Sequence, residues 1–167
     1  MTNYVSNAYH HLKTINTHRR LVREHCFKAG IPIQGLLHDL SKYHPVEFMA
    51  GVKYFAGDHS PNVEERRNTG YSAAWLHHKG RNKHHLEYWL DYGFPPDRSI
   101  TGMNMPKKYV VEMFMDRIAA CKVYMKESGY HDAAPWEYYA RSKSILLMHD
   151  ETRALLEEML RMLAEKG

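Results

Sequence analysis

The dipeptide His38-Asp39 restricts the fold more than any other feature of this chain. It follows the apolar run 33–37 and precedes the residues Leu40-Ser41-Lys42. Adjacent side chains on one helix diverge by about 100°, so these two can bind one ion only at the flank of their helix, and other helices must complete the ligand set. Imidazole and carboxylate ligands together suit Fe, Mn, Zn or Ni. Candidate partners stand at intervals that suit separate helices: His18, His77-His78, His84-His85 and Asp116.

The composition is that of a globular protein with an unusual load of histidine. Thirteen of the 167 residues are histidine, and 44% of the residues are hydrophobic, which is enough to bury the core of one domain. The two cysteines lack metal-type spacing, and no segment has the pattern of a secretion signal or a membrane span. We therefore expect a cytoplasmic protein without a membrane partner. A net charge of +4 is modest, so nucleic acid is not the favoured partner.

Helical periodicity dominates the first half of the chain. Apolar residues recur at intervals of three or four from about residue 3 to 29, and Gly30 and Pro32 end that helix. We expect a short helix that carries His38-Asp39 and a third helix that begins at Pro45. Ser60-Pro61 predicts the start of a helix that runs through to the first histidine pair, where Gly80 ends it.

The second half of the chain is also predicted to be helical. The second histidine pair should open a short helix, residues 92–105 should form a loop, and Pro106 should introduce a long helix. Two further helices are expected near 136–145 and 152–165, and the apolar stripe of the last one is either core or a dimer contact. No segment alternates convincingly as a strand, so the fold should be all-α.

Three fragments appear in an order that resembles the HD phosphohydrolase superfamily, a group of all-α metal-dependent enzymes. They are Thr17-His18-Arg19-Arg20, Leu37-His38-Asp39-Leu40-Ser41-Lys42 and Met115-Asp116-Arg117-Ile118, each on its own predicted helix. The resemblance covers about residues 10–125 and is closest to a small uncharacterised branch. It implies a bundle of about six to eight helices, with residues 1–167 as one HD-like domain and 130–167 as its carboxy-terminal helical extension.

The candidate metal ligands come from the residues and from the resemblance together. His38 and Asp39 stand in an apolar setting, where an unpaired carboxylate would be costly, and Asp116 is flanked by apolar residues. The family pattern favours His18 over its rivals His25, His10 and His11. Two-metal members of the superfamily bind a second ion through later histidines, for which we choose one residue from each pair. The predicted ligand set is His18, His38, Asp39, His77, His84 and Asp116, with His78 and His85 as alternatives.

The resemblance implies hydrolysis of a phosphate ester, a nucleotide being one option, at one or two divalent ions (Mn, Fe, Zn, Ni or Mg). Lys42 and Arg117 are candidate phosphate contacts, and Glu47 is a candidate general acid or base. Two other hypotheses stay open. Some superfamily members with this ligand set are di-iron oxygenases, and a nonenzymatic nucleotide- or RNA-binding module would hold no tightly bound metal.

Overall fold

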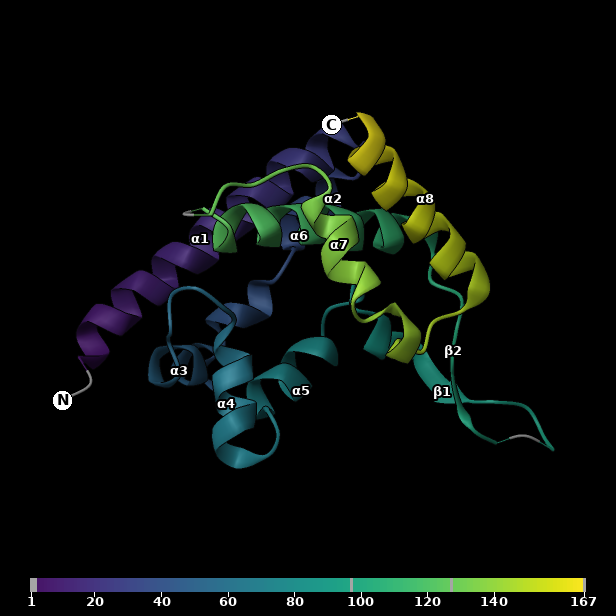
Figure 1. Cartoon of the computed structure of the whole chain (residues 1–167). Coiled ribbons are helices and arrows are strands. Elements are labelled where there is room, and N and C mark those ends of the chain that lie inside the picture. Colours follow the sequence, from purple (N-terminus) through teal and green to yellow (C-terminus); the bar gives the residue numbers. More distant parts are fainter. Residues whose placement is uncertain (1–2, 97, 127, 167) are drawn as a thin grey trace.

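The structure is a computed structural model that describes residues 3–96, 98–126 and 128–166. Within those residues it is an all-α bundle of eight α-helices, which confirms the predicted fold class (Figure 1). None of these helices is both long enough and apolar enough to cross a bilayer. The helices are α1 (Tyr4–Lys28), α2 (Pro32–Leu37), α3 (Pro45–Lys53), α4 (Pro61–Thr69), α5 (Ala73–Lys79), α6 (Lys107–Tyr124), α7 (Ala134–Ala140) and α8 (Asp150–Lys166).

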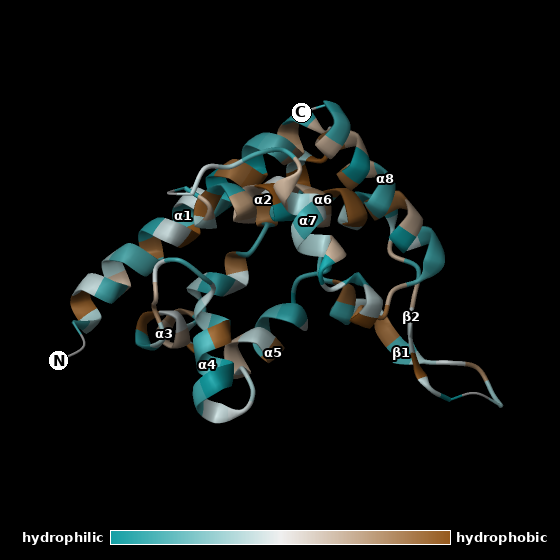
Figure 2. Ribbon diagram, viewed as in Figure 1, coloured by the Kyte–Doolittle hydropathy of each residue, from teal (hydrophilic) through white to brown (hydrophobic). Residues whose placement is uncertain are grey.

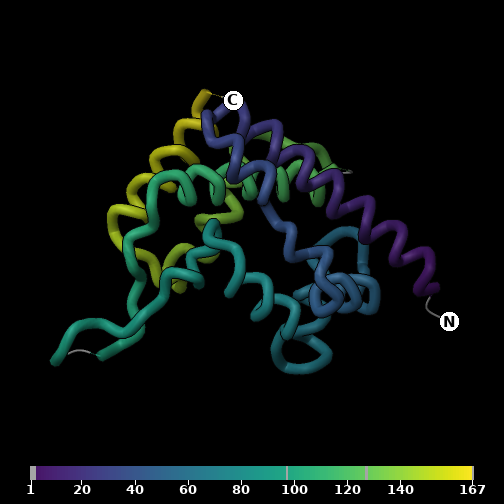
Figure 3. Tube along the Cα trace, turned by 180° about the vertical axis from the view of Figure 1, so that it is seen from behind, coloured from purple at the N-terminus to yellow at the C-terminus, as the bar shows by residue number. Residues whose placement is uncertain are grey.

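Short elements connect the helices. The 3₁₀ helices are η1 (Leu40–Tyr43), η2 (Leu86–Trp89) and η3 (Lys143–Ile145). Strands β1 (Leu90–Tyr92) and β2 (Ile100–Gly102) pair antiparallel, with Leu90 opposite Gly102, and their hairpin extends away from the helices (Figures 1 and 3). The prediction of no strand was wrong here, because three-residue strands are too short to show alternation in the sequence.

The helix predicted to run from Pro61 to the first histidine pair is two helices. Ser60 caps α4 as predicted, but Gly70 ends that helix in the left-handed region at φ +82°. Ser72 then caps α5: its Oγ accepts a hydrogen bond from Trp75 N at 2.9 Å and donates to buried Glu65 at 2.5 Å. The resulting bend directs α5 toward the centre of the molecule (Figure 1).

Two long helices form the frame of the molecule. Helix α1 packs against α6, α2 and α3, while α6 also contacts α7 and α8 (Figure 1). Apolar and polar residues are interspersed along α1 and α8 (Figure 2), as expected of helices that bury one face. The apolar stripe of α8 packs into the core with α6, which favours the core interpretation of that stripe. The main core cluster comprises Leu86, Met105, Val110, Met113, Phe114, Ile118, Tyr139, Leu156 and Leu160.

Two glycines allow close helix contacts that fix the elements around the central histidines. Gly35 of α2 lies against α1, where an added Cβ would be 2.7 Å from Cys26 Cβ. Gly51 of α3 lies against the ring of His11, where an added Cβ would be 1.9 Å from Nε2. These contacts set α2 and α3 at fixed places along α1.

Replacing Gly35 with alanine should lower the free energy of unfolding by about 1–3 kcal/mol, because the methyl group must push α2 away from α1. Alanine otherwise stabilises a helix relative to glycine, so the sign of the change is diagnostic. Urea unfolding measures it, with Ile33→Ala on the exposed side of α2 as the control. A Gly35→Ala protein that is as stable as wild type would contradict the close contact.

The buried His11 should make the fold sensitive to acid. Burial and the nearby charge of Lys42 lower the pKa of His11 from 6.5 to about 4. Between these values the unfolded chain binds a proton that the folded chain does not, so stability falls as the pH drops from about 6.5 toward 4. A His11→Gln variant should therefore lose less stability than wild type between pH 7 and pH 5, by about 1–2 kcal/mol.

Urea unfolding of the two proteins at both pH values measures this difference. The exposed Val5 of the same helix provides the control, since Val5→Gln introduces the same side chain without removing a titratable group and should keep the wild-type pH dependence. An unchanged pH dependence in His11→Gln would show that this imidazole is not held neutral by burial.

Candidate metal centre

The His38-Asp39 pair lies at a break between two helices. Helix α2 ends at Leu37, His38 is its C-cap, and Asp39 has a left-handed backbone with φ 53° and ψ 28°. The prediction that a helix carries both residues was wrong. The break matters because it turns two adjacent side chains toward one point, which a continuous helix would not do. A left-handed aspartate is mildly strained, and surrounding contacts must hold it in place.

Arg19 of α1 holds this break together. Its Nε donates to His38 O at 2.8 Å and its Nη2 donates to Leu36 O at 3.1 Å, so one carbonyl in the last turn of α2 and that of its C-cap are satisfied. Its Nη1 donates to the hydroxyl of Tyr43 at 3.0 Å. Because Arg19 is the residue after His18, the same turn of α1 supplies one candidate ligand and the side chain that holds the backbone of two others, His38 and Asp39.

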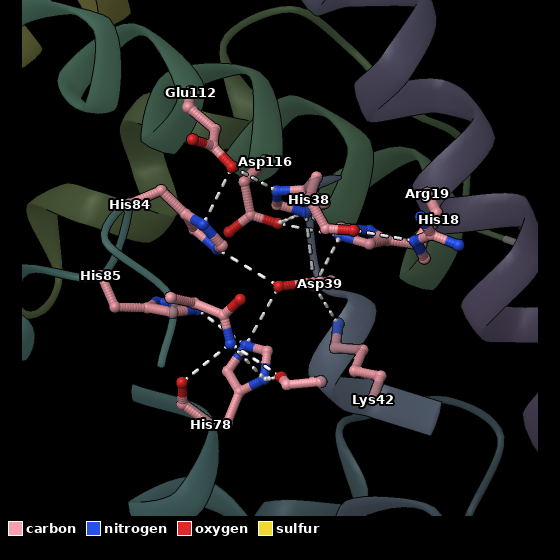
Figure 4. Close-up of polar contacts among 12 residues, drawn as sticks. His18, Arg19, His38, Asp39, Lys42, His78, His84, His85, Glu112 and Asp116 are labelled. Carbon is pink, nitrogen blue, oxygen red and sulfur yellow. Dashed lines mark hydrogen bonds and ion pairs between the residues drawn. The ribbon is translucent and has the colours of Figure 1, made fainter. Parts of the chain in front are cut away.

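Four predicted ligands meet in a first group: His18, His38, Asp39 and Asp116. His18 Nε2 lies 2.9 Å from Asp116 Oδ1 and 3.3 Å from His38 Nε2. His38 Nε2 lies 3.3 Å from Asp39 Oδ2, and the candidate ligand atoms of the group all lie within 4.8 Å of one another (Figure 4). Three separate segments of the chain thus bring their predicted residues together.

A second group lies on the other side of Asp39 and contains His78, His84 and His85. His78 Nε2 and His84 Nε2 lie 3.3 Å and 3.4 Å from Asp39 Oδ1, and His85 Nε2 lies 2.8 Å from His78 Nε2. The structure places His84 in this group as chosen, together with its alternative His85. It places His78 there rather than His77, because successive residues of α5 face different directions and the sequence does not reveal which one faces inward.

Asp39 is shared between the groups. Its side chain is 1% exposed, with Oδ2 toward the first group and Oδ1 toward the second. Asp39 Oδ1 and His84 Nε2 are both buried without a hydrogen-bond partner. Buried polar atoms rarely stay unsatisfied, and a cation between them would satisfy both. The donor set fits one divalent ion on each side of Asp39, with nitrogen and oxygen ligands suited to Fe, Mn, Zn or Ni.

Two buried glutamates orient the histidines from behind. Glu112 Oε1 accepts from His38 Nδ1 at 2.9 Å and from His84 Nδ1 at 3.1 Å. Glu47 Oε2 lies 2.8 Å from His78 Nδ1, and its Oε1 lies 2.6 Å from His77 Nδ1. Such contacts leave Nε2 as the free, ligating nitrogen. Glu47 is therefore placed to position a histidine, and its predicted acid or base role stays a prediction.

The two predicted phosphate contacts differ in their surroundings. Lys42 Nζ lies 2.7 Å from Asp39 Oδ2, and its side chain is 31% exposed. Arg117 lies over the Tyr139 ring at 5.6 Å, and its Nε is buried without a partner. The side chain of Asp116 is 18% exposed whereas that of His38 is fully buried, so solvent reaches the cluster from the side of Asp116 and Lys42.

Burial and charge set the protonation of the cluster. Burial opposes ionisation of Asp39, but the charges of His38 and Lys42 hold the pKa of its carboxyl well below the usual range. Burial lowers the pKa of His18, and it lowers the pKa of His85 further still. Burial also opposes charge on His38, but Asp39, Asp116 and Glu112 raise its pKa well above the usual value. A cation bound at Nε2 of His38 would therefore have to displace a proton from that nitrogen.

Substitutions of the two glutamates test metal binding at the two groups separately. Glu112 contacts one histidine of each group, so Glu112→Gln should weaken binding of both ions, by about 10- to 100-fold. Glu47 contacts only the second group, so Glu47→Gln should weaken one ion and leave the other unchanged. Titration of metal-stripped protein with Mn²⁺ or Zn²⁺ against a chromophoric chelator measures the affinity for each of the two ions.

The exposed Glu158 of α8 serves as the control, because Glu158→Gln should leave the affinities for both ions unchanged. If Glu112→Gln matched this control, Glu112 would have no role in orienting the histidines.

Comparison with known proteins places the chain in a family. Residues 7–162 match the model described as "Family of unknown function (DUF5662)". No curated protein and no solved structure matches the chain. The matched range contains every residue of the two groups, from His18 to Asp116. Because the match spans nearly the whole sequence, the chain belongs to this family of unknown function, DUF5662.

Proposed function

We propose that this protein is a metal-dependent hydrolase of small phosphate esters, built on an HD-type centre for two divalent cations. The observation that carries the proposal is the shared aspartate. The two carboxylate oxygens of Asp39 face separate histidine-rich groups. When bound, two such cations would supply Lewis acidity toward a phosphoryl oxygen and lower the pKa of water.

The residues on the open side of the centre suit an anionic substrate. Lys42 is partly exposed beside Asp39, and its ammonium has two further donor positions for a phosphate oxygen. Asp116 borders the same opening and would hold its cation there. The fully buried His38 and His84 have no access to substrate, so they act as ligands only. Substrate therefore enters between Lys42 and Asp116.

Metal content is the first test of this proposal. Protein purified without a metal-binding tag should hold two non-iron divalent ions per chain by elemental analysis. A His38→Ala, Asp39→Ala double variant should hold none, because it removes ligands from both groups. His85→Phe and Asp116→Asn should each lose one ion, since each residue belongs to one group.

The alternative functions predict different metal contents. Two irons per chain, with O₂ consumption, would identify a di-iron oxygenase, which the three imidazoles of the second group also suit. Equal metal content in wild type and the double variant, after growth with added metals, would exclude both enzymes and favour a binding module.

Activity on phosphate esters is the second test of this proposal. Wild-type protein should hydrolyse nitrophenyl phosphates or nucleotides, and chelation should abolish the activity. Lys42→Met should lower kcat/KM by about 10- to 100-fold without loss of metal, because it removes a charged hydrogen bond to phosphate. Lys53→Met, an exposed lysine of α3, should leave kcat/KM unchanged. Unchanged kcat/KM in Lys42→Met would exclude this lysine as the phosphate contact.

A further inference from the structure

A second cavity lies on the opposite face of α6 from the metal centre. Glu112 and Asp116 point toward the metal centre, whereas Phe114, Ile118 and Lys122 follow at i+4 spacing about 200° away around the helix. The cavity has a volume of about 300 Å³, at the lower end of small-ligand sites. The end of α1, Tyr130, Asp132 and the end of α8 complete its wall.

The floor of this cavity is apolar and its rim is cationic. Phe114, Met115, Ile118 and Leu163 supply the apolar lining. His25, Lys28 and Lys122 stand at the rim with a single acidic residue, Asp132. An apolar floor with a few convergent polar groups is the usual composition of a small-ligand site.

The cationic groups at the rim lack acidic partners. Within the described part of the chain, neither Lys28 nor Lys122 forms an ion pair with a carboxylate. Lys122 Nζ instead lies 3.4 Å from His25 Nε2 and 5.0 Å from the centre of the Tyr130 ring. Burial, Lys122 and Lys28 together lower the pKa of His25, which indicates that both positive charges act at this imidazole. Burial and a hydrogen bond to Asp132 raise the pKa of the Tyr130 hydroxyl, so Asp132 is engaged with Tyr130.

We propose that this cavity binds a small amphipathic monoanion, a carboxylate with an apolar body. The apolar body would occupy the floor formed by Phe114, Ile118 and Leu163. The carboxylate would accept hydrogen bonds from Lys122, with the charge of Lys28 nearby. An uncharged molecule would leave the ammonium without a partner, and a cation would meet two like charges. This site is separate from the proposed hydrolase centre.

Octanoate titration of the full-length, metal-loaded protein tests the proposal by methyl NMR. The methyl resonances of Met115, Ile118 and Leu163 should shift saturably with octanoate. Octylammonium has the same body and the opposite charge, so it should not bind there. Lys122→Met keeps the apolar stem but removes the charge, and it should weaken octanoate binding about tenfold or more.

Two controls keep the result specific. Lys107→Met removes an exposed lysine from the same helix and should leave octanoate binding unchanged. Lys28→Met gives a second variant at the rim in case Lys122→Met folds poorly. The proposal is overturned if octanoate causes no saturable shift at the cavity, if octylammonium binds equally well, or if the shifts occur only around His38.

Discussion

The buried negative charge of Asp39 is the constraint around which the rest of the structure is arranged. An ionised carboxylate with 1% exposure costs several kcal/mol unless it is paired, so every element nearby must supply a partner. The break after α2 exposes both carboxylate oxygens to different neighbours, and Arg19 holds that break through two backbone carbonyls. Histidines from α1, α5 and the segment before η2 then converge on the same side chain. The strained backbone of Asp39 is the geometric condition for a centre with two sides.

Helix α6 connects the candidate metal centre with the second cavity. One face supplies a candidate ligand, Asp116, and a glutamate one turn earlier, Glu112, that orients two histidines. The opposite face packs into the main core and forms the wall of the second cavity. Because a packed helix moves as a rigid element, a ligand that displaces α6 would also displace Asp116 and Glu112. The two sites therefore share a support, although they share no residue.

The sequence predicted the helical class, most element positions and the residues of the first group, because these depend on local periodicity and on an ordered set of motifs. It did not predict that His78 rather than His77 faces inward, since a seven-residue helix has too few apolar positions to define its phase. Glu112 was missed because it lies in the apolar pattern of α6 with no local sign of a histidine partner 74 residues away. The role of Arg19 was missed because two of its partners are backbone carbonyls, which leave no mark in the sequence.

Charge balance explains how such a centre can attract an anion despite its carboxylates. Asp39, Asp116, Glu47 and Glu112 surround the histidines, and Lys42 is the ammonium among them. Without metal, four carboxylates against the Lys42 ammonium and the protonated His38 leave two negative charges, which would repel a phosphate ester. Metal binding would displace the His38 proton, so the protein groups would then carry three negative charges. Two divalent cations would reverse the sign and leave one net positive charge beside the open side, where Lys42 stands. In the proposed hydrolase the metals are therefore required for substrate binding as well as for chemistry. The negative charges of Glu47 and Glu112 offset part of the positive charge of the two cations.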